Sequence, residues 1–326
     1  MRNFIALPLV ALVAGLAALS QKPAPQPPSA KDEPAERDQI IKVDVDLVNV
    51  LCSVRDKKGA FLTNLTKDDF AIYEEGKQQE IRYFGREKDL PLTIGLLVDV
   101  SKSQESLIDI ERRAGAQFFE RVLTKKDMAF LISFGAEVEL LQDLTNSNRT
   151  LRKGLDELKL NAGVGGVLPS PTGAQPRGTV MFDAVYLAAN EKLKREVGRK
   201  VMVLITDGVD QGSRLRIHDA IEAAQKSDAI IYAVYYADPR YQFGFGASDG
   251  DLKRMATETG GRVYYVNNRR SLENIFDEIQ EEMRSQYAIG YSSSRSRDGS
   301  FRKIEIKTKA RDTKVQARRG YYATKE

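Results

Sequence analysis

LTIGLLVDVSKS, residues 92–103, joins an apolar run to a polar segment that holds one carboxylate and two hydroxyls. The apolar run, Leu92–Val98, has the length and content of a strand that is buried on both faces of a sheet. An amphipathic helical pattern extends from Leu107 to Val122 behind it. The stretch therefore predicts a strand-to-helix junction, and ligands of open α/β sheets bind at the carboxyl ends of such strands.

After Pro91, apolar runs alternate with helical patterns, which predicts a Rossmann-like, doubly wound and mainly parallel sheet with helices on both faces. One later helix is expected over Leu272–Met283. Glu137–Leu141 follows its neighbouring run across a two-residue break and predicts an antiparallel edge hairpin. The further expected strands are Met128–Phe134, Val201–Ile205, Ile230–Tyr235 and Val263–Val266.

Both flanks of this α/β segment show the period-two alternation of strands. On the amino-terminal side the alternation begins at Ile41 and slips by one residue at Val48, which predicts a bulge or a bend there. On the carboxyl-terminal side it returns from Tyr287 onward. Because a few short strands are marginal alone, we expect both flanks to form one smaller, discontinuous β domain into which the α/β domain is inserted.

The first residues have the layout of a secretory signal peptide, with Arg2 followed by an apolar run, Phe4–Leu19. An uncleaved membrane anchor is the alternative. Gln21–Arg37 is rich in proline and charge and reads as a tether. The expected division is 1–20 signal peptide, 21–39 linker, 40–88 and 287–326 β domain, and 89–286 α/β domain. The mature chain is expected to have no membrane span and to reside in the periplasm or outside the cell.

Composition excludes several classes of function. A single cysteine, Cys52, permits no internal disulfide and is expected to be a buried core residue. The net charge of +4 is a small excess among charges of both signs and gives no reason to expect nucleic acid. The only histidine, His218, lies in a polar-faced helical pattern without a serine elbow elsewhere, so nucleophilic catalysis has no support.

Three predicted strand-to-helix junctions place oxygen ligands at one edge of the sheet. They contribute Asp99, Ser101 and Ser103, then Thr179, and then Asp207. Two carboxylates about 4 Å apart repel by roughly 4 kcal/mol at an effective dielectric near 20, and a divalent cation between them removes this cost. Hard oxygen donors suit Mg²⁺ or Mn²⁺. Taken singly, the hydroxyls have another interpretation as helix caps, but three junctions together favour a metal site.

At these residues the chain resembles a known family. Asp99-x-Ser101-x-Ser103, followed by Thr179 and Asp207, resembles the metal-ion-dependent adhesion site of von Willebrand factor type A domains. The flanking text Asn64–Ile81, NLTKDDFAIYEEGKQQEI, and the ending Ala317–Tyr321 are similar to exported proteins of this family from acidobacteria.

The resemblance implies that the hydroxyls bind Mg²⁺, that Asp99 and Asp207 often act through water, and that an open coordination position accepts a carboxylate from a protein partner. An exported, non-enzymatic adhesion module is therefore expected. A scaffold whose metal site is empty is one alternative, because Lys102 places an ammonium beside the motif. A metal-assisted hydrolase is a remote alternative, because Ser101 stands where phosphate-handling α/β enzymes of similar layout carry a second acid.

Two predicted loops and one acidic residue are further candidates for a functional role. Tyr241, Phe243 and Phe245 lie among glycines after a strand and suit a partner-contact loop, although packing onto the core is an equal alternative. Asn161–Gly178 is glycine- and proline-rich and predicts a long functional or disordered loop before Thr179. Asp210 is interpreted as a turn residue or as support for the metal site.

Overall fold

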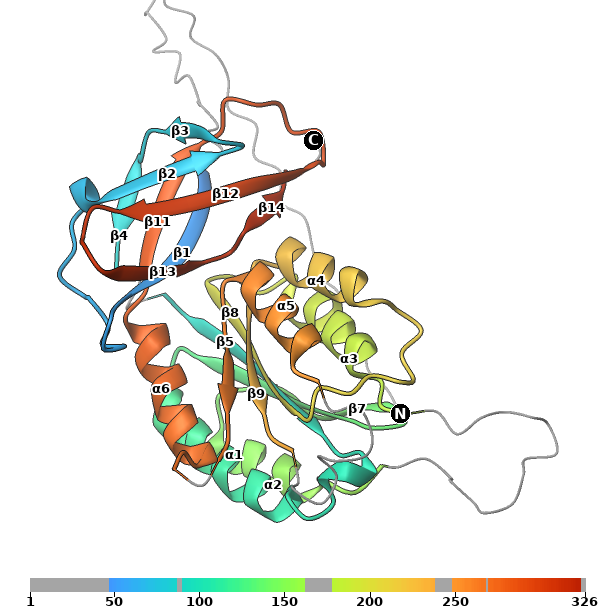
Figure 1. The fold of residues 1–326 in the computed structure, drawn as a ribbon. Helices are drawn as coiled ribbons and strands as arrows, with labels where there is room; N and C mark the ends of the chain where they lie inside the picture. Colours follow the sequence, from blue (N-terminus) through green and yellow to red (C-terminus); the bar gives the residue numbers. More distant parts are fainter. Residues whose placement is uncertain (1–46, 87–89, 162–177, 238–247, 268, 324–326) are drawn as a thin grey trace, which may run out of the picture. The chain divides into compact units, whose positions relative to one another are not determined.

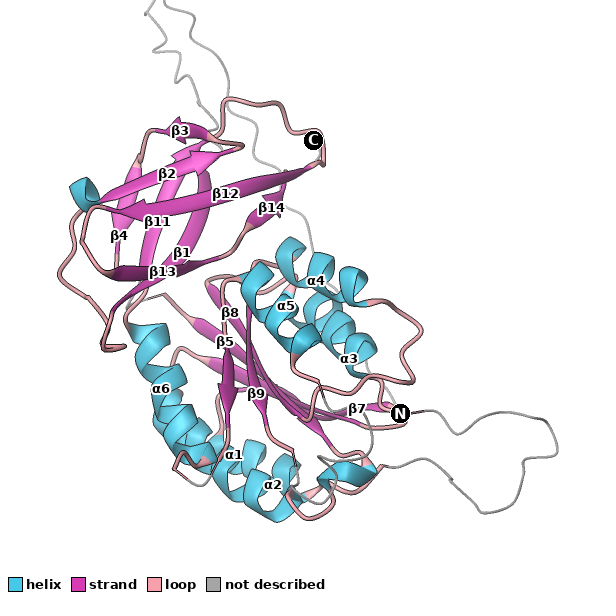
Figure 2. Cartoon of the chain, in the orientation of Figure 1, coloured by secondary structure: helices cyan, strands magenta, loops and turns pink. Residues whose placement is uncertain are grey.

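The computed structural model describes residues 47–86, 90–161, 178–237, 248–267 and 269–323, and its strands form three sheets (Figures 1 and 2). The largest has the order β10-β9-β8-β5-β6-β7, and all neighbours are parallel except β6 and β7. The expected Rossmann-like fold class and the antiparallel edge are therefore confirmed. Its strands are β5 (Leu92–Asp99), β6 (Met128–Phe134), β7 (Val138–Thr145), β8 (Arg199–Thr206), β9 (Ala229–Tyr235) and β10 (Val263–Tyr265).

Helices cover both faces of this sheet (Figure 1). One face packs against α1 (Ile108–Val122), α2 (Asn148–Asp156) and α6 (Leu272–Arg284), and there Phe118 stacks on Phe276 with ring centroids 4.5 Å apart. The other face packs against α3 (Met181–Leu187), the π-helical turn η3 (Ala188–Leu193), α4 (Ile217–Lys226) and α5 (Gly250–Thr259). Every residue of β5 is buried, which explains its continuous apolar sequence.

Strands from the two flanks pair with each other in two antiparallel four-stranded sheets. Their inward-facing side chains form one shared core, which makes this part a β-sandwich. One sheet contains β13 (Thr313–Ala317), β1 (Leu47–Asp56), β11 (Tyr287–Ser292) and β4 (Tyr83–Gly85), and the other contains β14 (Gly320–Tyr322), β12 (Phe301–Thr308), β2 (Phe70–Glu74) and β3 (Lys77–Gln79). A 3₁₀ turn, η1 (Lys67–Asp69), precedes β2.

Local expectations were correct in part. Cys52 is buried in the sandwich core, and its burial raises the pKa of the thiol to about 12. The bulge expected at Val48 is wrong for the described part of the strand, because Leu47–Cys52 pairs with β11 without a shift in register. His218 lies exposed on α4 beside Asp219 and Glu222, as expected for a solvated helix residue. Within the described ranges, no helix has the length and apolar content to cross a membrane.

A buried carboxylate connects the sandwich to the α/β part of the chain. Glu282 of α6 is fully buried and accepts hydrogen bonds from the Ser53 hydroxyl at 2.8 Å and the Arg55 guanidinium at 2.8 Å. It also accepts from the Tyr264 hydroxyl at 2.9 Å and lies 2.9 Å from Arg262 Nε. Strand β1, helix α6 and strand β10 therefore meet at one charge.

Replacing Glu282 by alanine is expected to lower the free energy of unfolding by about 3–5 kcal/mol, because Arg55 and Arg262 lose the carboxylate that compensates them. Urea denaturation measures this loss. Glu281→Ala is the matched control, because Glu281 directly precedes Glu282 in α6 and is exposed. This substitution is expected to change the free energy of unfolding by less than about 0.5 kcal/mol. Equal stabilities of the two variants would show that the buried cluster contributes little.

Candidate metal site

The register between β5 and β8 brings the expected site residue Asp99 beside Thr206, which directly precedes the expected site residue Asp207. Val98 pairs with Ile205, so Asp99 and Thr206 follow side by side. The Thr206 hydroxyl donates to Asp99 Oδ2 at 2.6 Å, and the Ser101 amide donates to Asp99 Oδ1 at 2.9 Å. Asp99 is fully buried. Its carboxylate is therefore fixed at the carboxyl edge of the sheet before any ion binds.

The two serines of the motif lie next to each other. Ser101 Oγ and Ser103 Oγ are 3.1 Å apart. Ser101 precedes the 3₁₀ turn η2 (Lys102–Gln104) but makes no side-chain capping bond, and Leu107 is the residue that precedes α1. The capping interpretation of Ser101 is therefore wrong, and both hydroxyl oxygens keep lone pairs for another ligand.

Asp207 enters the same edge from β8. It is 5% exposed, and its Oδ1 accepts a hydrogen bond from the Val209 amide at 3.2 Å. Gly208 turns the chain directly after it with a φ of +81°, and a Cβ there would lie 2.3 Å from the carbonyl oxygen of Ser248. Only glycine satisfies both the left-handed backbone and this close approach.

Thr179 is joined to the Asp207 loop through its backbone. Its carbonyl oxygen accepts hydrogen bonds from the amides of Gln211 at 3.1 Å and Gly212 at 3.0 Å. The residue that precedes α3 is Val180, and it makes no side-chain cap, so Thr179 does not cap this helix. The described contacts thus bring the Thr179 segment to the loop after Asp207, while a ligand role for its hydroxyl stays a prediction.

Asp210 has a supporting role that its turn position alone did not reveal. Its Oδ2 accepts hydrogen bonds from the Phe182 amide at 3.0 Å and from the Ser213 hydroxyl at 2.6 Å. It therefore binds the first turn of α3 to the loop that carries Asp207. The aromatic loop residues Tyr241, Phe243 and Phe245, and most of the loop 161–178, lie outside the described residues.

The two carboxylates, Asp99 and Asp207, make the carboxyl edge of the sheet anionic. Burial and the neighbouring Asp207 carboxylate raise the pKa of Asp99 to about 7, although hydrogen bonds from Ser101 and Thr206 act in the opposite direction. The exposed ammonium of Lys102 is paired with Glu105, with 2.5 Å between Nζ and Oε2. That pairing offsets the charge of Lys102, which lowers its repulsion of an ion at the motif.

Two further polar side chains lie buried behind the motif. Gln104 and Glu111 are both 0% exposed, and neither Gln104 amide atom nor either Glu111 oxygen has a hydrogen-bond partner among the described residues. Burial, and secondarily the charge of Asp99, raises the pKa of Glu111 well above its usual value. The sequence signal was available, because Glu111 occupies the apolar stripe of α1 that contains Ile108 and Ala114.

The donor set fits a divalent cation. Two carboxylates and two adjacent hydroxyls lie at one sheet edge, and such hard oxygen ligands are those that Mg²⁺ and Mn²⁺ prefer. Within the described residues, no group of three or more His, Cys, Asp or Glu side chains could hold a metal ion. A site here depends on hydroxyls as much as on carboxylates.

The fold and this edge define an α/β domain that places oxygen donors at the carboxyl ends of its central strands. Residues 94–278, more than half of the chain, match the model of the von Willebrand factor type A domain. The chain belongs to this family.

Known proteins similar to the chain are distant. The BatB protein from Bacteroides thetaiotaomicron is 15% identical, covers 59% of this chain and 97% of its own, and has a TM-score of 0.45. Proximal thread matrix protein 1 from the mussel byssus, solved with zinc in its adhesion-site motif, is 14% identical over 65% of this chain and 50% of its own, with a TM-score of 0.46. A 6-carboxyhexanoate–CoA ligase from Sulfurihydrogenibium azorense is 24% identical over 66% of this chain and 95% of its own.

The raised pKa of Asp99 predicts that the metal-free protein loses stability as pH rises. Asp99 ionises near pH 4 in the unfolded chain but near pH 7 in the folded chain, so the folded state holds an extra proton between these values. The free energy of unfolding should therefore fall by up to about 1.4 kcal/mol per pH unit in this window. Urea denaturation in chelator at several pH values measures the slope.

Asp99→Asn should flatten this slope, because the amide does not titrate. The slope that remains in the variant belongs to other groups, including Glu111, whose pKa is raised in the same direction. Identical slopes in the two proteins would contradict the assignment of the extra proton to Asp99.

Glu111→Met is expected to stabilise the protein by about 1–3 kcal/mol near neutral pH, because it replaces a buried carboxyl, which has no hydrogen-bond partner in the described ranges, with an apolar side chain of similar volume. Thermal or urea denaturation tests this. Glu120→Met, on the exposed side of α1, is the control and should have little effect. A loss of stability in Glu111→Met alone would mean that the carboxyl is bound by water or an ion.

Proposed function

We propose that the chain is an exported, non-enzymatic interaction protein that binds Mg²⁺ or Mn²⁺ at Asp99, Ser101, Ser103, Thr179 and Asp207. Through the bound ion it contacts an acidic group of a protein partner. The observation that supports the proposal is that the Ser101 and Ser103 hydroxyls are 3.1 Å apart beside Asp99, whose carboxylate is close enough to Asp207 for its pKa to be raised. Membership of the von Willebrand factor type A family supports it.

The charge of the site supports binding of a cation, and the bound cation in turn supports contact with an acidic group of a partner. The Asp207 carboxylate raises the energy of the ionised form of Asp99, and a divalent ion relieves that repulsion. Mg²⁺ retains several waters and exchanges them, so a carboxylate from outside can take one coordination position. Ser101 and Ser103 hydroxyls add no charge, which leaves the bound ion able to attract an anion.

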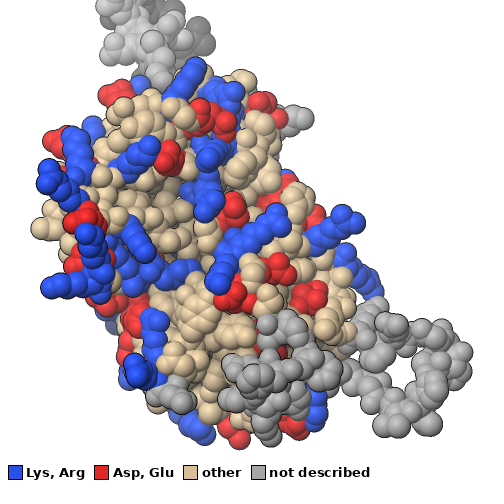
Figure 3. Space-filling model, in the orientation of Figure 1, with Lys and Arg blue, Asp and Glu red and all other residues tan. Residues whose placement is uncertain are grey.

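Support for a binding role without catalysis comes from what the site contains. Its side chains are hydroxyls and carboxylates, and His218 lies on the exposed side of α4 beside two acids. On the face in Figure 3, basic and acidic side chains are interspersed, which supports a protein partner more than a nucleic acid. Support for export is the apolar run Phe4–Leu19, which lies outside the described residues.

Isothermal titration with Mg²⁺ and Mn²⁺ tests the metal site. Wild-type protein is expected to bind, and Asp99→Ala is expected to lose binding by at least about tenfold, because one charge-assisted ligand is worth roughly 1.5–3 kcal/mol. Asp109→Ala, an exposed acid at the start of α1, is the control and should bind like wild type. Equal heats for wild type and Asp99→Ala would remove the metal claim and leave a scaffold with an empty site.

A second experiment tests the partner chemistry. Immobilised peptides that differ only by Glu, Asp or Gln at one position are offered to the protein in Mg²⁺ and in chelator. Capture by the acidic peptides in Mg²⁺ alone is the expected result. Capture that persists in chelator, or that is equal for Gln, would contradict recognition through the ion.

A further inference from the structure

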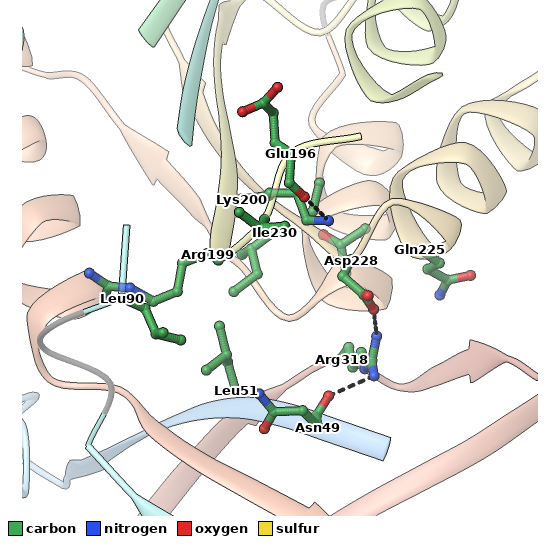
Figure 4. Close-up of a pocket in the computed structure, with 14 residues that line it drawn as sticks. Asn49, Leu51, Leu90, Glu196, Arg199, Lys200, Gln225, Asp228, Ile230 and Arg318 are labelled. Atoms are coloured by element: carbon green, nitrogen blue, oxygen red, sulfur yellow. Dashed lines mark hydrogen bonds and ion pairs between the residues drawn. The ribbon is translucent and has the colours of Figure 1, made fainter. Parts of the chain in front are cut away.

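A cavity of about 330 Å³ lies near the start of β8, and Figure 4 shows the residues that line it. It is lined on one side by β1 and by Arg318, which follows β13, and on the other by the first residues of β8 and β9. Lys200 is the second residue of β8 and Thr206 is the last, so the cavity and the candidate metal site lie about 20 Å apart along one strand. Cavities of this volume are large enough for a small metabolite.

The wall of the cavity combines apolar and cationic groups. Leu51, Leu90 and Ile230 line it together with the polar side chains of Lys200 and Arg318. In Figure 4 the three apolar side chains lie on the same side of the Lys200 ammonium, toward β1. A molecule with one apolar end and one charged end matches this division.

Among the cationic side chains that line the cavity, Lys200 has N–H donors left for a ligand. Its Nζ donates to the carbonyl oxygen of Glu196 at 3.0 Å, and an ammonium has three N–H donors. Among the described residues it forms no ion pair within 4.0 Å, and Figure 4 shows the Glu196 carboxylate pointing away from it. Burial lowers the pKa of Lys200, although Asp228 and Glu196 act in the opposite direction. Hydrogen-bond donors thus remain in a half-buried place.

The two arginines of the lining are bound to the protein itself. Arg318 is paired with Asp228 and donates to the Asn49 carbonyl oxygen at 2.8 Å. Arg199 donates to the Met283 carbonyl oxygen at 2.6 Å. These bonds fix the positions of the two arginines. Lys200 is therefore the cationic side chain of the lining that we expect to bind a ligand.

We propose that this cavity binds a small amphipathic carboxylate, with its charged end on Lys200 Nζ and its apolar end against Leu51, Leu90 and Ile230. A single ammonium with unused donors can pair with one carboxylate, whereas a phosphate dianion is best held by a guanidinium fork, and both arginines of the lining are bound to the protein. The inference is independent of the metal site, because no lining residue is shared.

Titration calorimetry with octanoate as the probe, on the full chain, tests the proposal. Wild type is expected to bind octanoate more tightly than octanol, which has the same chain without the charge. Lys200→Met should weaken octanoate binding by at least about tenfold and change octanol binding by less than about twofold. Lys194→Met, an exposed lysine before the same strand, should bind both probes like wild type.

A second variant keeps the test decisive if Lys200→Met folds poorly. Asn49→Trp adds a large side chain on the exposed edge of the cavity without removing a charge, and it should abolish binding of both probes. Unchanged octanoate affinity in Lys200→Met or in Asn49→Trp would overturn the proposal. So would the absence of octanoate binding to wild type at millimolar concentration.

Discussion

Parallel pairing of β5 with β8 is the constraint on which the rest of the α/β part depends. The register that sets Val98 beside Ile205 also places Asp99 beside Thr206, so the strands cannot slip by one residue without separating the carboxylate from its hydroxyl donor. Because both strands are buried on both faces, a slip would also disturb the cores formed with helices on each side. Packing of the apolar cores thus fixes the positions of the polar residues at the sheet edge.

Burying the acids at the polar edge destabilises their ionised forms, and the packing of the apolar core offsets this cost. Asp99 and Glu111 are fully buried acids whose pKa values are raised by desolvation, and Asp207 lies close enough to raise that of Asp99 further. A fold selected for stability alone would replace such groups with apolar ones. Their presence behind one motif supports the view that this edge serves a ligand, as strained or costly arrangements concentrate at functional sites.

Sequence patterns were sufficient for the fold class and for the strand ends that carry Asp99 and Asp207, because continuous apolar runs and helical stripes are local signals. The partners of these residues were not visible. Thr206 contacts Asp99 from a strand more than a hundred positions away along the chain, and Asp210 binds the start of α3 across a loop. Glu282 was likewise hidden, since its four donors come from β1, β10 and the segment before β10. Such contacts depend on tertiary register, which a single sequence does not encode locally.

The way the sandwich closes has a mechanical consequence. β4, which leads into the α/β segment, pairs with β11, which leads out of it, and Gly85 lies opposite Ala288. Tension applied to the two ends of the chain would therefore pull first on the hydrogen-bonded strands of the sandwich. The α/β segment would feel no force until those strands separate, so its sheet edge would be insulated from stretching of the chain.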